Sequence, residues 1–195
     1  MKFQSLCERL LFCLLFEALT LTDKMTNQLK IRAISSNETL PLRCAILRPD
    51  HPIQESIYAG DDDPSTQHWG AFVEDALIVI ASLYPEPLAG SVRHQAINKN
   101  EGPDGQQAGA TEHAWRLRGM AVHRAFQRKG YGRQLLHRCL ESVADHGGTI
   151  LWCNARSSAV GFYRGAGFET AGTEFVIPGI GPHYVMLRRM HGLRS

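Results

Sequence analysis

The stretch of sequence that decides the fold is Gln127-Arg128-Lys129-Gly130-Tyr131-Gly132. An apolar, strand-like segment precedes it, and a helical pattern runs from Gly130 to His146, where Gly147 and Gly148 end it. The first amides of a helix have no partner within the helix and carry partial positive charge. Glycine lacks the Cβ that would keep a ligand away from the backbone. The sequence therefore predicts an anion pocket at this helix start, suited to a pyrophosphate, with added charge from Arg128, Lys129 and Arg133.

Two other kinds of glycine loop do not match. A P-loop needs Gly-Lys-Ser/Thr at the helix start, whereas Gly132 is followed by Arg133 and Gln134. A dinucleotide-binding loop needs a third glycine where Leu135 stands. An ordinary glycine-rich turn before a helix remains the alternative interpretation of these six residues alone.

The rest of the chain predicts strands and helices in mixed order. A helix with Thr39 as its cap and Pro41 in its first turn ends at Arg48-Pro49. The apolar face of the helix after the glycine loop is Leu135, Leu136, Cys139, Leu140 and Val143. Strands are predicted at 29–34, 69–73, 77–83, 113–122, 149–154, 168–177 and 183–189, with a further helix at 157–166. This order indicates one mixed α/β domain.

Two segments stand apart from that domain, which we assign to residues 25–195. Residues 1–24 form an N-terminal extension whose apolar run, Leu10 to Phe16, is too short to span a membrane. It is interpreted as an amphipathic helix or a misassigned start, with Met25 as an alternative first residue. Residues 85–112 are polar and longer than most ordered connections, so they are expected to be a flexible insertion.

Composition excludes several classes of partner. The net charge is only +2 in 195 residues, and no run of Lys and Arg indicates a nucleic-acid surface. The five cysteines include no CxxC spacing, so no metal site is expected. Reduced, mostly buried cysteines suit a cytoplasmic protein, although a catalytic thiol is the sharper alternative.

Three motifs in order resemble the GNAT acyltransferase superfamily. Gln127, Gly130 and Gly132 match its Gln/Arg-x-x-Gly-x-Gly/Ala loop. The preceding segment, Arg116 to Val122, is similar to the family's central strand, which typically ends in an apolar residue followed by Ala and Val. Downstream, the segment from Asn154 to Phe168 resembles the family's Asn…Ala…Phe-Tyr…Gly-Phe pattern. The specific match covers roughly a quarter of the chain.

The resemblance implies an α/β fold with a central mixed sheet of about seven strands, splayed between the fourth and fifth strands and flanked by helices. It implies acetyl-CoA as co-substrate, with transfer to a primary amine of a small molecule or peptide in a ternary complex. The residues expected at the coenzyme are Met120, Ala121, Val122, Gln127, Arg128, Lys129, Gly130, Tyr131, Gly132, Arg133 and Asn154. A strand-end cap is the alternative interpretation of Asn154.

Two residues are expected to be catalytic. Tyr163 is the leading general acid for the departing thiolate, with a packed aromatic as the alternative. His183 is the candidate named as general base, with a surface histidine on a strand as the alternative interpretation, and Glu174, Glu112 and His123 stay open as other candidates. The acidic turn Asp61–Asp63 is interpreted as solvated, with steering of a cationic amine as the second interpretation.

Other functions stay open at this point. A non-catalytic acyl-CoA sensor on the same fold is the main alternative. A nucleotide-binding module would use the same glycine loop, and a membrane role for residues 1–24 is a weaker hypothesis. The sequence does not determine the acceptor amine, the acyl length or the oligomeric state, a homodimer included.

Overall fold

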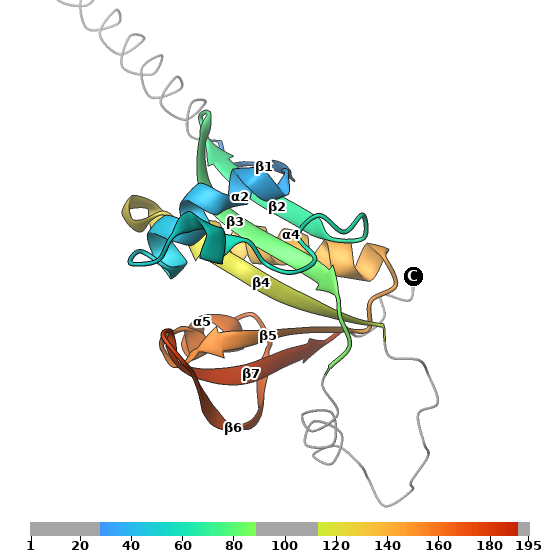
Figure 1. Cartoon of the computed structure of the whole chain (residues 1–195). Coiled ribbons are helices and arrows are strands. Elements are labelled where there is room, and N and C mark those ends of the chain that lie inside the picture. The colour runs from blue at the N-terminus through green and yellow to red at the C-terminus, as the bar shows by residue number, and fades with distance from the viewer. Residues whose placement is uncertain (1–27, 89–112, 191–195) are drawn as a thin grey trace, which may run out of the picture.

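A computed structural model describes residues 28–88 and 113–190 (Figure 1). Within them, seven strands form one sheet in the order β1-β2-β3-β4-β5-β7-β6. The strands are β1 (Lys30–Ala33), β2 (Gln67–Val73), β3 (Ala76–Pro85), β4 (Ala114–Val122), β5 (Ile150–Arg156), β6 (Glu169–Ile177) and β7 (Gly181–Arg189). All neighbours are antiparallel except β4 and β5, which are parallel. The predicted mixed sheet is confirmed.

The sheet splits between β4 and β5. The two strands pair only from Ala114–Ile150 to Arg116–Trp152. Beyond these pairs, β4 continues to Val122 and β5 to Arg156 without a register between them. Figure 1 shows the two strands diverging, with β1–β4 in one arm and β5–β7 in the other. The splay expected between the fourth and fifth strands is therefore present.

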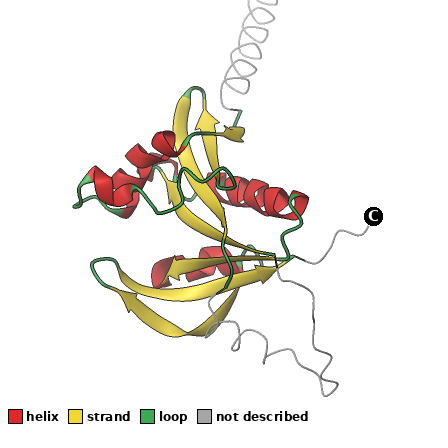
Figure 2. Cartoon of the chain, turned by 45° about the vertical axis from the view of Figure 1, so that its right-hand side comes forward, coloured by secondary structure: helices red, strands yellow, loops and turns green. Residues whose placement is uncertain are grey.

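We call β1–β4 the upper arm and β5–β7 the lower arm. Helices cover both faces of the upper arm (Figure 2). On one face lie α2 (Ser36–Leu42), the π-helical turn η1 (Arg43–Leu47) and the 3-10 turn η2 (Ile53–Ser56). We call this the front face. On the back face lies α4 (Tyr131–Asp145), which follows the short turn η3 (Arg124–Phe126). The lower arm carries η4 (Ser157–Ala159) and α5 (Val160–Arg164) between β5 and β6.

The main core lies between α4 and the sheet. Leu135, Leu136, Cys139 and Val143 of α4 are fully buried there, and Leu140 is nearly so. These are the residues whose helical spacing predicted one apolar face, so this prediction is confirmed. A smaller front cluster joins Leu42 to Ile80 and Ala121. Apolar burial on both faces holds β4 in place up to its last residue.

The first helix begins earlier than predicted. Its cap is Ser35, not Thr39: the Ser35 hydroxyl accepts from the Glu38 amide, and Glu38 Oε2 accepts from the Ser35 amide at 2.7 Å. This reciprocal capping box satisfies two amides at once. Thr39 is instead buried, and Pro41 lies inside the helix rather than in its first turn.

Several expectations concern segments outside the described ranges. The N-terminal extension 1–24 and most of the insertion, 89–112, belong to them. The start of that predicted insertion is described and packs on the fold. Pro85 ends β3, and Leu88 is buried beside Ile150 and Trp152. No helix among the described residues is long and apolar enough to cross a membrane.

Candidate active site

The loop between β4 and α4 presents a run of unpaired amides. Arg128 and Gly130 adopt left-handed backbone conformations, with φ of 58° and 87°. Within the part of the chain that the structure describes, the backbone N–H groups of residues 128–133 donate no hydrogen bond. The first bond of α4 is from the Gln134 amide to the Gly130 carbonyl, at 3.2 Å. Consecutive unpaired amides at a helix start, which carries partial positive charge, can bind an anion.

The two glycines of this loop differ in their surroundings. A Cβ on Gly130 would meet no atom within 4 Å, so the space above its backbone is open. A Cβ on Gly132 would lie 3.2 Å from Val122 Cγ2 and 3.7 Å from Phe162 Cε2. Gly132 therefore lets the start of α4 approach the end of β4 closely, beside the aromatic side chain of α5.

The polar side chains of the loop have separate roles. Gln127 Nε2 donates to the Val122 carbonyl at 3.0 Å, which ties the loop to the strand end. Arg128, Lys129 and Arg133 are exposed at the rim. Lys129 lies over the Phe126 ring at 5.5 Å, and Arg133 Nη2 is 3.5 Å from the Gly165 carbonyl. Three exposed cations can add positive potential to the amide run.

A β-bulge lies in the splayed part of β4. Ile80 pairs with Ala121 and Ser82 with Arg118, so Gly119 and Met120 stand opposite Ala81 alone. Gly119 has a φ of 62°, which glycine adopts without strain. A Cβ there would come within 2.8 Å of Arg43 Nε. The bulge interrupts the ladder with β3 at Met120, the first of the predicted coenzyme residues, and just before the other two, Ala121 and Val122.

Tyr163 of α5 lies at the split, on the back face. Its side chain is buried, and its hydroxyl is 3.8 Å from Met120 Sδ on β4. Burial, with the neighbouring Cys153 thiol of β5 also contributing, raises the pKa of Tyr163 well above its ordinary value. The phenol therefore stays protonated near neutral pH. The structure brings Tyr163 next to both diverging strands.

Asn154 and His183 lie on the lower arm. Asn154 is half-buried on β5, opposite Val185 of β7, and lies past the last β4–β5 pair. His183 stands opposite Arg156 of β5 and Phe175 of β6. It is 4% exposed, and its Nδ1 is 2.8 Å from the Gly181 carbonyl. A carbonyl can only accept, so Nδ1 carries the hydrogen and Nε2 of the neutral ring has the lone pair.

The other candidate bases are already engaged or lie elsewhere. Glu174 accepts a hydrogen bond from the Ser157 hydroxyl. His123 caps η3, where its Nδ1 accepts from the Ala125 amide at 3.3 Å. Glu112 lies outside the described residues. His183 is therefore the remaining candidate: among the described residues, its second ring nitrogen, Nε2, takes part in no hydrogen bond.

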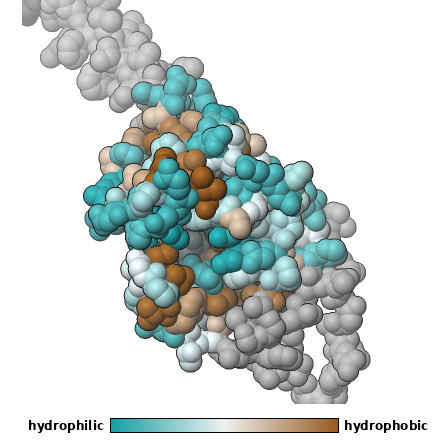
Figure 3. All heavy atoms as spheres, viewed as in Figure 1, coloured by the Kyte–Doolittle hydropathy of each residue, from teal (hydrophilic) through white to brown (hydrophobic). Residues whose placement is uncertain are grey.

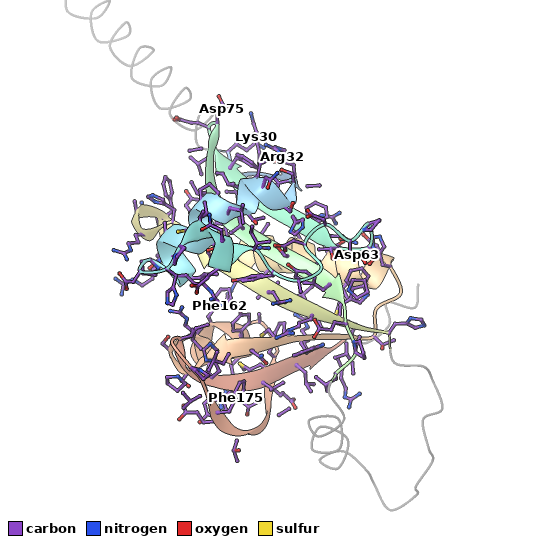
Figure 4. All side chains as sticks on the ribbon, in the orientation of Figure 1. Lys30, Arg32, Asp63, Asp75, Phe162 and Phe175 are labelled. Atoms are coloured by element: carbon purple, nitrogen blue, oxygen red, sulfur yellow. The ribbon has the colours of Figure 1, made fainter. Side chains whose placement is uncertain are left out.

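Asp61 corrects the expectation of a solvated acidic turn. Its carboxylate binds the buried Arg43 guanidinium through two hydrogen bonds, of 2.6 and 3.0 Å, and accepts from the Tyr84 hydroxyl and the Tyr58 amide. The side chains of Arg43 and Asp61 are 0% and 3% exposed. Asp61 is therefore engaged by Arg43 and is not available to steer an amine. Asp63, by contrast, is exposed and labelled in Figure 4.

Thiol and metal chemistry find no support among the described residues. Burial raises the pKa of Cys139 and of Cys153 to about 12, so both stay protonated thiols. Cys44 is half-buried and also unpaired with another cysteine. In the described ranges, no three His, Cys, Asp or Glu side chains gather as metal ligands would.

Sequence reasoning missed two residues near the split. Phe162, which is 38% exposed, lies between the two arms in Figure 4. Its place in a Phe-Tyr motif was visible, but its exposure was not. Arg118, on β4 two residues before Met120, was treated only as part of a strand. Its side chain lies among Tyr58, Ala59 and Tyr84, which are distant in sequence, so the local sequence does not reveal these contacts.

Comparisons with known proteins identify the class. Residues 103–186 match the family model described as an acetyltransferase (GNAT) domain. Over 167 residues, the chain is 32% identical to the uncharacterized N-acetyltransferase YitI of Bacillus subtilis (strain 168). This alignment covers 85% of this chain and 99% of that protein. The chain therefore belongs to the GNAT acetyltransferase family and is an acyltransferase of the N-acetyltransferase kind.

Solved structures agree on the fold. A putative N-acetyltransferase from Lactobacillus plantarum superposes with a TM-score of 0.63 at 19% identity, covering 85% of this chain and all of that one. An aminoglycoside 6'-N-acetyltransferase complexed with coenzyme A gives a TM-score of 0.57 at 13% identity, covering 85% of this chain and 99% of that one. At such identities, the likeness extends to the fold only.

Proposed function

We propose that this enzyme transfers an acetyl group from acetyl-CoA to a primary amine of a small molecule or peptide, directly in a ternary complex. The observation that carries the proposal is the run of unpaired amides at residues 128–133, placed beside the split between β4 and β5. The residues present fit the coenzyme, because these amides suit its pyrophosphate and the backbone at Gly130 is open. When bound, acetyl-CoA supplies the activated acyl group as a thioester.

The splayed part of β4 is proposed to hold the arm of the coenzyme. Within residues 28–88 and 113–190, the backbone of Met120 to Val122 has no strand partner on the β5 side, so it can pair with an extended ligand as with an added strand. The bulge at Gly119 and Met120 leaves backbone groups outside the β3 ladder. An N–H there would stabilise negative charge that develops on the thioester carbonyl oxygen. Asn154 lies on β5 beyond the last residue pair with β4 and is proposed to contact the same arm.

Tyr163 is proposed as the general acid. Its phenol carries a proton at neutral pH, as tyrosine ordinarily does, and burial raises its pKa further. Its hydroxyl lies near Met120 at the bulge. As the carbon–sulfur bond breaks, Tyr163 would give its proton to the departing thiolate. Cys153 is buried with a pKa of about 12, so we assign it no covalent step. No acyl-enzyme is required.

His183 is proposed as the general base. With Nδ1 bonded to the Gly181 carbonyl, Nε2 can take the proton that the amine loses as its nitrogen–carbon bond forms. His183 and Trp152 lie on the front face, since His183 stands opposite Arg156, whereas Tyr163 packs on the back face. An acid and a base on opposite faces suit a thiolate and an amine that occupy opposite sides of the split.

The cellular setting is proposed from the cysteines. The three described cysteines are all unpaired, as expected in a reducing compartment such as the cytoplasm. A homodimer is kept as a proposal, which size measurements in solution would decide.

A thiol-release assay with acetyl-CoA tests this function. Wild type should release CoA with at least one member of a panel of amino acids, polyamines, aminoglycosides and peptide N-termini. Tyr163→Phe should lower turnover by roughly 10²-fold or more while CoA still binds, because the thiolate loses its proton donor. Tyr184→Phe, the same change on β7, should retain wild-type turnover. CoA binding without thiol release across the panel, or full activity of Tyr163→Phe, would contradict the proposal.

A further inference from the structure

Three arginines, Arg43, Arg116 and Arg118, lie on the front face, and two of them form ion pairs with a carboxylate. Arg43 is neutralised by Asp61. Arg116 Nη1 is paired with Glu86 Oε1 at 2.7 Å, and its guanidinium lies over the Trp152 ring. Across residues 28–88 and 113–190, no carboxylate is within ion-pair distance of Arg118. One positive charge of this group is therefore uncompensated.

The surroundings of Arg118 hold it in place without neutralising it. Its guanidinium lies 4.6 Å from the Tyr58 ring centre and 5.1 Å from that of Tyr84. Its one hydrogen bond among the described residues is a long one, 3.4 Å from Nη1 to the Ala59 carbonyl. Partial burial, and then repulsion from Arg116, lowers the pKa of Arg118, and the weaker attraction of Tyr84 and of the Glu86 carboxylate does not offset them. A half-buried guanidinium with most of its donors unused is a ready partner for an anion.

Arg118 lies on the front face of β4, beyond the last residue pair that β4 makes with β5. It lies two residues beyond Arg116, the last residue of β4 that pairs with β5, on the face that carries η1 and η2. Met120, the second residue of the bulge, is two residues beyond Arg118, so the proposed acyl position is about 7 Å along the strand, at about 3.3 Å per residue. An extended guanidinium and a small amine together span such a distance.

A second uncompensated arginine approaches from the other arm. Arg156 ends β5 on the same face as Trp152, and its Nη2 donates to the Leu47 carbonyl of η1 at 2.7 Å. No carboxylate pairs with it in the described ranges. Figure 3 shows hydrophilic residues across the middle of this face, between two hydrophobic groups. The opening is thus flanked by positive charge from both arms, which disfavours a polycation.

We propose that the acceptor amine also carries a carboxylate, as an amino acid does, and that Arg118 binds this carboxylate while the amine reaches the bulge. This proposal rests on the acetyl-transfer function above and names its class of acceptor. Arg156 adds attraction for the same anion at the rim. The proposed acceptors exclude polyamines, whose charge both arginines would repel.

Matched acceptor pairs test this proposal. Phenylalanine is compared with phenylalaninamide, leucine with leucinamide, and both pairs with spermidine, by CoA release. Wild type should prefer the acid of each pair by about 10-fold or more in kcat/KM. Arg118→Gln should raise KM for the acids by roughly 10- to 100-fold, the range for a charge-assisted hydrogen bond, and leave KM for the amides unchanged. Arg118→Lys, which keeps the charge, should recover part of the preference.

Arg32→Gln is the matched control. Arg32 also stacks on an aromatic ring, that of Phe72 at 4.2 Å, but it lies on β1, away from the split (Figure 4). Its loss should leave the acid preference as in wild type. Equal or better transfer to the amides or spermidine would overturn the proposal while leaving acetyl transfer intact.

A binding measurement separates the two failures. If no amine releases CoA, the proposed function fails, and equilibrium dialysis with CoA present then decides the role of Arg118. N-acetylphenylalanine should be retained by wild type, more weakly by Arg118→Gln, and more tightly than N-acetylphenylalaninamide. No retention, or retention that is equal in Arg118→Gln, would overturn the proposal.

Discussion

Replacing Asp61 by Asn would leave the Arg43 guanidinium buried without its counter-charge. Arg43 is fully buried, and Asp61 accepts two of its hydrogen bonds together with those of Tyr84 and Tyr58. Asn is nearly the same size but keeps only one acceptor oxygen and no charge. Removing one partner of a buried ion pair typically costs about 3–5 kcal/mol of unfolding free energy. We expect a loss in that range.

The loss should be easy to measure. For a domain of this size, each kcal/mol lowers Tm by about 2–4 °C, so Asp61→Asn should melt roughly 6–20 °C below wild type. Urea unfolding at low temperature gives the free energy directly. Asp63→Asn is the control, because among the described residues the exposed Asp63 carboxylate binds only the neighbouring Ser65, and its substitution should cost less than about 0.5 kcal/mol. A penalty for Asp61→Asn under about 1 kcal/mol, or equal to that of Asp63→Asn, would refute the reasoning.

Three further predictions follow from the same structure. The penalty of Asp61→Asn should shrink in acid. Burial alone would raise the pKa of Asp61, but its hydrogen bonds with Arg43 and Tyr84 outweigh burial and lower that pKa. The stability that the Arg43–Asp61 pair contributes is therefore present above the unfolded pKa of about 3.9 and is lost as pH falls through the lower folded value. Urea titrations of both proteins from pH 7 to pH 2 check this, and a penalty that stays constant would contradict it. Gly132→Val should weaken CoA binding, measured by calorimetry, by roughly 10-fold or more. The new Cβ would already lie 3.2 Å from Val122, and the two γ-methyl groups of valine would enter the loop. The control Ala144→Val, at the exposed far end of α4, should bind CoA as wild type does. Gly119→Ala should lower the unfolding free energy, measured in urea, by at least about 1–2 kcal/mol, because a left-handed φ and a 2.8 Å approach to Arg43 Nε both oppose a Cβ. An unchanged unfolding midpoint would contradict the requirement for glycine at this bulge.

Local sequence rules predicted those parts of the fold that depend on near neighbours. The spacing of Leu135, Leu136 and Cys139 identified the buried face of α4, because helical periodicity alone places these side chains together. The unpaired amides of residues 128–133 were likewise expected, since every helix start leaves such groups. The start of α2 is encoded locally too, since Ser35 and Glu38 have the spacing of a capping box; the predicted cap at Thr39 is wrong because this pair satisfies the first amides four residues earlier.

The parts that failed depend on contacts distant in sequence. Asp61 is 18 residues from Arg43 and 23 from Tyr84, and only the folded chain brings all three together. The exposed turn suggested by three adjacent aspartates was therefore wrong for the first of them. Arg118 is a candidate anion-binding residue because Asp61 and Glu86 pair with the two neighbouring arginines and leave it without a carboxylate. No local sequence pattern shows which of the three arginines has no such partner. The catalytic roles of Tyr163 and His183 stay predictions.

The most direct test of the central claim is calorimetry of the wild-type protein with coenzyme A and, separately, with pantetheine, which lacks the pyrophosphate. If the amides of residues 128–133 bind the pyrophosphate, coenzyme A should give saturable heat at one site per chain, and pantetheine should bind at least roughly 10-fold more weakly. An absence of heat with coenzyme A, or equal affinity for the two ligands, would contradict the claim.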